Sequence, residues 1–257
     1  MYSDFFTFGV RSACVIFSLI FDIREIVMRK NAQRIKVMVA VAMFSALAYV
    51  STLLCSFFPD VAGFLSLEIK DAVIVICSLL FGPLSGFLIA IIVPLLEFFT
   101  ISATGWYGLV MNVLSSATFA LVTGFIYKYK KTFYGAVIGL LAGIFSVTAV
   151  MMLANLFITP LYLEYVIGVP TSMSDILDMI PTILLPFNLV KATINAAIVL
   201  MLYMPVSTIM KEIGVVEISG DDMTINTKSI IRYIVVTNIS AVIIVLSLVI
   251  IFLVIGK

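Results

Sequence analysis

The sequence contains no histidine at all and few charged residues of either sign. Histidine is the commonest metal ligand and the commonest general base in proteins, so its absence removes most hydrolase chemistry within a membrane. The three cysteines, Cys14, Cys55 and Cys77, lie on apolar stretches without a CxxC spacing, which indicates small core residues rather than metal ligands or disulfides. We therefore expect no metal site, no cofactor and no enzymatic activity.

Charge balance and missing motifs exclude further classes of protein. The 15 basic residues nearly balance the 14 acidic residues, which gives no reason to expect a nucleic-acid partner. No loop of the form G-x-x-x-x-G-K-[ST] occurs, so the chain does not itself hydrolyse ATP. Glu97 is an isolated acid by sequence, and an isolated acid without a nucleophile or a metal set does not make a catalytic site.

Hydrophobic residues, in contrast, dominate the chain. They make up 63% of its 257 residues, and the mean hydropathy is +1.26, which predicts an all-α membrane protein with several helices in the lipid bilayer. The apolar runs predict seven crossings, of which the second and third are shorter than a usual span. These runs are 35–58, 72–81, 84–99, 107–127, 133–158, 186–205 and 230–255.

The crossings divide the chain into three parts. Residues 1–27 hold an apolar run that is broken by Arg11, which predicts an interfacial amphipathic helix or an extension upstream of a true start at Met28. A full span there is the weaker interpretation. Residues 28–210 form a six-helix membrane domain, and residues 211–257 form a cytoplasmic linker with an additional C-terminal transmembrane helix. The stretch 159–179 is predicted to be a loop.

The distribution of basic residues predicts the orientation of the bundle in the membrane. If the segment before Ile35 is cytoplasmic, ten of the 15 basic residues fall in cytoplasmic segments, as the positive-inside rule requires. This orientation places Asn155 at the outer end of its helix, and Asn188 and Lys191 in the outer half of theirs. The three polar side chains therefore share one level near the outer face.

The stretch 181–204 carries Asn188, Lys191 and Asn195 on one helical stripe, because offsets of three and four residues share a face. A lysine at membrane depth costs a few kcal/mol and normally faces a cavity or a partner. Two alternatives remain from spacing alone. The asparagines can hold neighbouring helices together, and a lysine near a helix end can extend to the lipid headgroups.

The polar set at the outer level suits one kind of ligand. Two carboxamides each donate and accept, and a lysine donates, so the set fits a planar edge with alternating donors and acceptors. A neutral heterocycle fits better than a strongly anionic substrate. Aromatic residues near the outer side either stack on such a ring or form an interfacial belt. They are Phe57, Phe58, Phe64, Trp106, Tyr107, Tyr162 and Tyr165.

Three stretches resemble a known family: FLSLEIKDAVIVICSLLFGPLSGF, TGWYGLVMN and, most specifically, LPFNLVKATINAAIVLMLY. They are similar to the riboflavin-specific S component of energy-coupling factor (ECF) vitamin transporters, over about residues 28–210. The resemblance implies a six-helix substrate-capturing subunit for riboflavin uptake in the bacterial plasma membrane. It implies a transmembrane coupling protein and two cytoplasmic ATPases as partners. An S component for a different vitamin or a nucleobase-like substrate is the alternative.

The resemblance also implies roles for individual residues. Asn188 and Lys191 match the family's flavin-binding asparagine and lysine, and Asn155 matches a further asparagine at the isoalloxazine edge. Leu67 and Glu68 lie in a loop that would cover the ligand. Ala42 and Ala46 match a small-residue face of the first helix, where another helix can approach closely and the coupling protein would dock.

Overall fold

The computed structural model describes residues 31–57, 65–215 and 227–250, with the side chains of 227–230 excepted. The chain divides into two units, Met1–Ala40 and Val41–Lys257. In the first unit the described residues, 31–40, are helical. The interfacial helix predicted for residues 1–27 lies outside the described residues. The larger unit contains all three cavities and all of the ion pairs described below.

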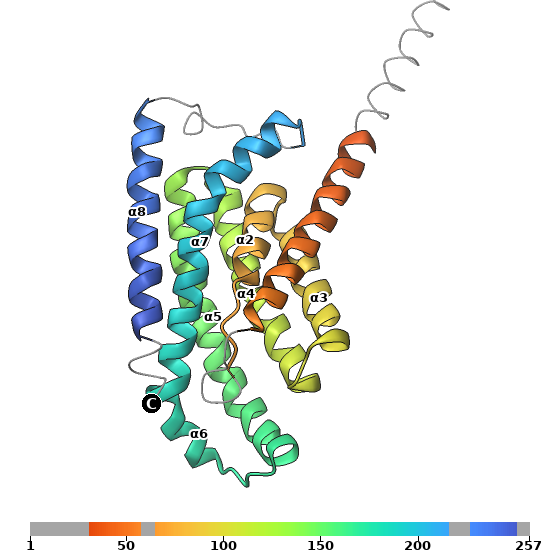
Figure 1. Cartoon of the computed structure of the whole chain (residues 1–257), viewed down its shortest axis with the longest axis vertical. Helices are drawn as coiled ribbons and strands as arrows, with labels where there is room; N and C mark the ends of the chain where they lie inside the picture. The colour runs from red at the N-terminus through yellow and green to blue at the C-terminus, as the bar shows by residue number, and fades with distance from the viewer. Residues whose placement is uncertain (1–30, 58–64, 216–226, 251–257) are drawn as a thin grey trace, which may run out of the picture. The chain divides into compact units, whose positions relative to one another are not determined.

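The regular elements that the structure describes are helices, which confirms the prediction of an all-α membrane protein (Figure 1). Helix Asn31–Cys55 precedes them, and six described stretches, this one included, are long and apolar enough to cross a membrane. The other main helices are α2 (Lys70–Phe81), α3 (Pro83–Thr100), α4 (Gly105–Tyr129), α5 (Phe133–Tyr162), α6 (Met173–Met179), α7 (Leu185–Glu212) and α8 (Thr227–Ile250).

The second predicted crossing is a short helix with a non-helical approach. Helix α2 has 12 residues, so it is about 18 Å long and does not by itself cross a hydrocarbon core of about 30 Å. The segment 65–69 before it is not helical and leads into α2 along a similar direction (Figure 1). Backbone of this kind is tolerated at membrane depth only where it is buried in protein or lines a cavity.

The prediction of a loop over residues 159–179 is wrong. Helix α5 continues to Tyr162, and a π-helical turn, Leu163–Ile167, follows it directly. Helix α6 then begins at Met173 behind a capping box, in which the side chains of Ser172 and Asp175 each accept from the other residue's backbone N–H. This local hydrogen bonding allows a helix to begin in a stretch whose hydrophobic pattern predicts none.

The predicted end of the next span, at Pro205, is also wrong. Helix α7 has a proline in its first turn, as predicted, but it continues through Pro205 to Glu212. A proline removes only one helical hydrogen bond, and neighbouring helices support a transmembrane helix across that gap. The last two residues of this helix therefore fall within residues 211–257, which the sequence predicts to be a linker followed by an additional transmembrane helix. Helix α8 packs mainly against α7 and exposes apolar side chains such as Val242 and Leu246.

Helices α4 and α5 approach each other closely because glycines lie between them. A Cβ atom added at Gly143 would lie 2.6 Å from both Phe119 Cδ2 and Thr123 Oγ1, well inside van der Waals contact. The Thr123 hydroxyl donates to the Gly139 carbonyl across the same interface at 3.2 Å. Small residues thus allow the backbones to pack closely, as is usual in membrane helices.

We expect Gly143→Val to destabilise the protein by about 1–3 kcal/mol, because overpacking forces the two helices apart. The measurement is the midpoint of unfolding of the purified chain in detergent. Ala149→Val, on an exposed position of the same helix, is the control and should leave the midpoint unchanged. Equal losses in the two variants would show that the added side-chain bulk on the helix, and not its position at the interface, is responsible.

Candidate functional site

A chain of buried ion pairs lies where α2 begins. Lys70 Nζ lies 2.5 Å from Glu97 Oε2 and 3.0 Å from Glu68 Oε1, and Lys191 Nζ lies 2.9 Å from Glu68 Oε2. We call these four residues the ion-pair chain. The Lys70 side chain is 1% exposed, and the other three are largely buried. The prediction that Glu97 is an isolated acid is therefore wrong, because its partner lies 27 positions away in the sequence.

The remaining polar atoms around the ion-pair chain are also satisfied. Glu97 accepts from the Thr52 hydroxyl at 2.8 Å and from Asn112 Nδ2 at 3.2 Å. Asp71, the neighbour of Lys70, accepts from the Ser116 hydroxyl. Buried charges are tolerated when they are both paired and hydrogen-bonded. The network therefore allows a charged segment to lie inside an apolar bundle.

Glu68 is the central member of the ion-pair chain, since each of its carboxylate oxygens contacts a different lysine. Oε1 faces Lys70 and Oε2 faces Lys191, so one acid lies between two cations. Burial disfavours a charged carboxylate, but positive charges at hydrogen-bonding distance favour it. The Glu68 carboxylate in turn fixes the position of the Lys191 ammonium, because a charge-assisted hydrogen bond of this kind has a narrow geometry.

Asn195 connects α7 to the backbone of the segment before α2. Its Nδ2 donates to the Glu68 carbonyl at 2.9 Å, and its Oδ1 accepts from the Ala72 N–H at 2.8 Å. The first turn of α2 has no side-chain cap at Ile69, and the Ala72 N–H also donates to the Ile69 carbonyl at 3.2 Å, so Asn195 adds a second, shorter bond to this backbone donor. The third residue of the predicted polar stripe thus fixes segment 65–69 in place.

A cavity of about 100 Å³ lies between segment 65–69 and helices α4, α5 and α7. Four of the predicted substrate-binding residues line it: Asn155, Asn188, Lys191 and Glu68. The structure thus places these residues, from three separate parts of the sequence, around one space. Its lining also includes Ser66, Thr104, Tyr107, Met111, Asn112, Thr159, Tyr162 and Phe187.

Leu67, the fifth predicted residue, lines a neighbouring cavity of about 250 Å³ instead. The Leu67 side chain packs against a small apolar cluster that contains Phe187 and Ile194. The two cavities share part of their lining, which includes Ser66 and Asn112. Segment 65–69 therefore borders both spaces, and successive side chains along it serve one or both of them.

The two asparagines each retain hydrogen-bonding capacity toward the cavity. Asn155 Nδ2 donates to the Met151 carbonyl at 2.7 Å, and Asn188 Nδ2 donates to the Leu184 carbonyl at 2.8 Å, one turn earlier on each helix. A carboxamide has two N–H donors and two acceptor lone pairs. One N–H and at least one lone pair of each amide thus remain for a ligand, and these bonds to the backbone fix where they point.

The predicted aromatic residues divide into two groups. Tyr107 and Tyr162 line the cavity and meet edge to face, with ring centroids 6.0 Å apart. Trp106 and Tyr165 are largely exposed, as in an interfacial belt. Phe57 is exposed as well, and the predictions for residues 58 and 64 lie outside the described residues. Sequence reasoning missed Phe187, although it lies within the P-F-N stretch that carries the resemblance.

Ala42 and Ala46 lie away from the cavity, on an exposed face of the first helix. They are one turn apart and both exposed, whereas Ser45 and Ala48 on the same helix are buried. The small-residue face that the sequence predicts is therefore available to lipid or to another helix.

The fold and the cavity define a membrane protein of several helices that encloses a small polar site. The family model for the "ECF transporter, substrate-specific component" matches residues 36–203, and the chain belongs to this family. It is therefore a multi-pass membrane protein and a transporter subunit, and not an enzyme.

Individual relatives agree with the family. The "Riboflavin transporter RibU" of Staphylococcus aureus (strain TCH60) is 28% identical over 188 residues, which cover 71% of this chain and 96% of the relative. The "Riboflavin transporter FmnP" of Bacillus subtilis (strain 168) is 28% identical over 164 residues, which cover 63% and 86%. A solved structure of the S component of a bacterial ECF transporter matches with a TM-score of 0.57 and 26% identity, over 68% of this chain and 98% of that one.

We expect Lys70→Met to destabilise the protein by about 3–5 kcal/mol, because it leaves the Glu97 carboxylate buried without its cation. The measurement is the unfolding midpoint in detergent. Lys130→Met is the matched control, since Lys130 is exposed and should change stability by less than about 0.5 kcal/mol. An unchanged midpoint for Lys70→Met would mean that the ion-pair chain does not support the fold.

Proposed function

We propose that this chain is the substrate-binding membrane subunit of an ECF transporter that takes up riboflavin. Two relatives that are named riboflavin transporters support the choice of substrate. The observation that carries the proposal is the shared cavity of Asn155, Asn188 and Lys191. These residues supply directed donors and acceptors beside aromatic side chains, which is what a flat heterocycle requires.

The chemistry of the flavin ring fits this lining. The pyrimidine edge of the isoalloxazine ring alternates carbonyl acceptors with an N–H donor, so the free N–H groups and carbonyl oxygens of Asn155 and Asn188 complement it. Lys191 Nζ has three N–H donors, and its contact with Glu68 leaves others for a ring acceptor. Tyr107 and Tyr162 present apolar ring surface to the same space.

The sugar-alcohol tail of riboflavin calls for a second, more polar space. The neighbouring cavity supplies one, because its lining includes Ser66, Ser102, Thr104 and Asn112. At about 100 and 250 Å³ the two cavities together reach the lower end of the range of about 300–1,000 Å³ that is typical of ligand pockets. Glu68 borders both, so segment 65–69 would cover the ligand from ring to tail.

Any ATP hydrolysis that drives uptake would take place on partner proteins, because the sequence contains no nucleotide-binding loop of the Walker type. As a member of the ECF family the chain would work with a transmembrane coupling protein and two cytoplasmic ATPases. The loaded subunit would reorient in the bilayer, and closure of the ATPases would drive the exchange. The exposed face of Ala42 and Ala46 would contact the coupling protein, because small residues allow close and reversible helix packing.

The direct test is an equilibrium titration of the purified chain with riboflavin, followed by quenching of flavin fluorescence. Asn188→Ala should weaken binding by up to about tenfold, the effect of one lost hydrogen bond. Asn238→Ala, at an exposed position of α8, is the control and should bind normally. If the unmodified chain did not bind riboflavin but bound another vitamin or a nucleobase-like compound in a competition panel, the substrate assignment would be wrong.

The proposed contact with the coupling protein is tested separately. We expect Ala46→Trp to abolish riboflavin uptake in cells that express the partner proteins, because the indole prevents close helix approach. Riboflavin binding by the purified variant should remain normal. Phe145→Trp, a bulky change at an exposed position of α5, is the control for uptake. Loss of binding together with uptake in Ala46→Trp would indicate a folding defect instead.

A further inference from the structure

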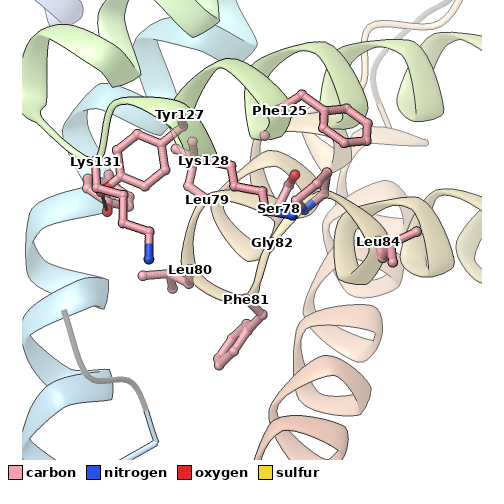
Figure 2. Close-up of a pocket in the computed structure, with 13 residues that line it drawn as sticks. Ser78, Leu79, Leu80, Phe81, Gly82, Leu84, Phe125, Tyr127, Lys128 and Lys131 are labelled. Atoms are coloured by element: carbon pink, nitrogen blue, oxygen red, sulfur yellow. Dashed lines mark hydrogen bonds between the residues drawn. The ribbon is translucent and has the colours of Figure 1, made fainter. Parts of the chain in front are cut away.

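A larger cavity, of about 440 Å³, lies at the opposite end of α4 from the proposed riboflavin site. Figure 2 shows this cavity in close-up. The turn between α2 and α3 at Gly82 forms one side, and the last turn of α4 forms another. Tyr203, in the second half of α7, also lines it. The residues that line this space take no part in the ion-pair chain or in the proposed riboflavin site, so they are available for a separate role.

Two lysines give this cavity a positive charge. Lys128 lies in the last turn of α4 and Lys131 lies in the turn before α5, and both line the cavity. Figure 2 shows the Lys131 amine extending into the open space. Within the described ranges neither lysine forms a salt bridge with a carboxylate. Both charges are therefore available to an anionic ligand.

A buried pair of tyrosines adds a spare hydrogen-bond donor. Tyr127 Oη and Tyr203 Oη lie 2.7 Å apart, and both side chains are buried against the cavity. Whichever hydroxyl donates in this contact, the other O–H has no acceptor among the residues that the structure describes. Donors left unpaired inside a protein are unfavourable, so a ligand rich in acceptor oxygens would be stabilised here.

The opposite side of the cavity is apolar and faces outward. Leu84, at the start of α3, is 71% exposed, and Phe125 on α4 is 45% exposed. Both line the cavity, and Figure 2 shows them on the side away from Lys131. In a membrane such exposed apolar side chains contact acyl chains. The cavity thus has a charged part beside a part that is open to lipid.

The depth of the cavity agrees with this arrangement. Helix α4 has 25 residues, so at about 1.5 Å per residue it is slightly longer than the hydrocarbon core of about 30 Å. A helix of this length that crosses the core would place its last turn, with Lys128, in the headgroup layer. Basic pockets between membrane helices at this level are known to bind anionic headgroups.

We propose that this cavity binds one anionic phospholipid. Its phosphate would lie between Lys128, Lys131 and the spare tyrosine hydroxyl, and its acyl chains would pass Leu84 and Phe125 into the bilayer. A free phosphate ion would accept hydrogen bonds from the same donors, but it has no acyl chains to contact the apolar side of the cavity. The proposal does not depend on riboflavin as the transported substrate.

The test is a lipid titration of the full chain, purified in a neutral detergent and followed by native mass spectrometry. The probes are dioleoyl phosphatidylglycerol, which is anionic, and dioleoyl phosphatidylcholine, which is not. We expect at least a tenfold preference for phosphatidylglycerol. Each lysine near a headgroup contributes about fivefold to affinity, so Lys128→Gln/Lys131→Gln should lose about 25-fold of the phosphatidylglycerol affinity. Phosphatidylcholine binding should not change.

Lys130→Gln is the matched control, because Lys130 lies between the two lysines in sequence but does not line the cavity. Lys130→Gln should retain the preference for phosphatidylglycerol. If it lost as much phosphatidylglycerol affinity as the double-lysine variant, general attraction to the charged surface would explain the binding and the proposal would be overturned. No preference in the unmodified chain would also overturn it. Full displacement of phosphatidylglycerol by millimolar inorganic phosphate would show a free-phosphate site. The unfolding midpoints of both lysine variants, measured with phosphatidylcholine present, should equal that of the unmodified chain, which would establish that the variants are folded.

Discussion

The contact of Glu68 with two lysines is the interaction on which the rest of this structure depends. Glu68 precedes α2 on a non-helical segment, and it pairs with Lys70 beside it and with Lys191 on α7. A charged, non-helical segment is unfavourable in an apolar bundle unless every charge and backbone group has a partner. The second carboxylate, Glu97, and the amide of Asn195 complete that requirement. Together they hold segment 65–69 between the helices.

The ion-pair chain that supports the fold also forms part of the proposed riboflavin site. Lys191 belongs both to the ion-pair chain and to the lining of the proposed riboflavin cavity, so a ligand that contacts it enters a preformed electrostatic network. A site whose donors are fixed by neighbouring contacts loses less conformational freedom when a ligand binds. Segment 65–69 carries Glu68 and borders both cavities, so the Glu68 pairs also hold one wall of each cavity in place.

The charged side chains at the two ends of the bundle differ in burial and in pairing. At the proposed riboflavin site the charged groups are paired and buried, and the lining offers the ligand neutral amides, aromatic rings and the remaining N–H donors of the paired Lys191. At the other end Lys128 and Lys131 are exposed and unpaired within the described part of the chain, beside a wide cavity. The first arrangement suits a neutral heterocycle, and the second suits a phosphate group.

The sequence by itself determined the class of protein, the approximate spans and three members of the polar site, because hydropathy and helical spacing are local properties. Residue spacing and the positive-inside orientation together predicted one shared level for Asn155, Asn188 and Lys191, and the structure places all three around one cavity. Only the tertiary structure decided that Glu97 is paired, that Asn195 fixes a backbone segment and that α7 continues through Pro205. Glu68 and Lys191 are 123 positions apart, and no local pattern encodes a contact that forms only when distant helices pack.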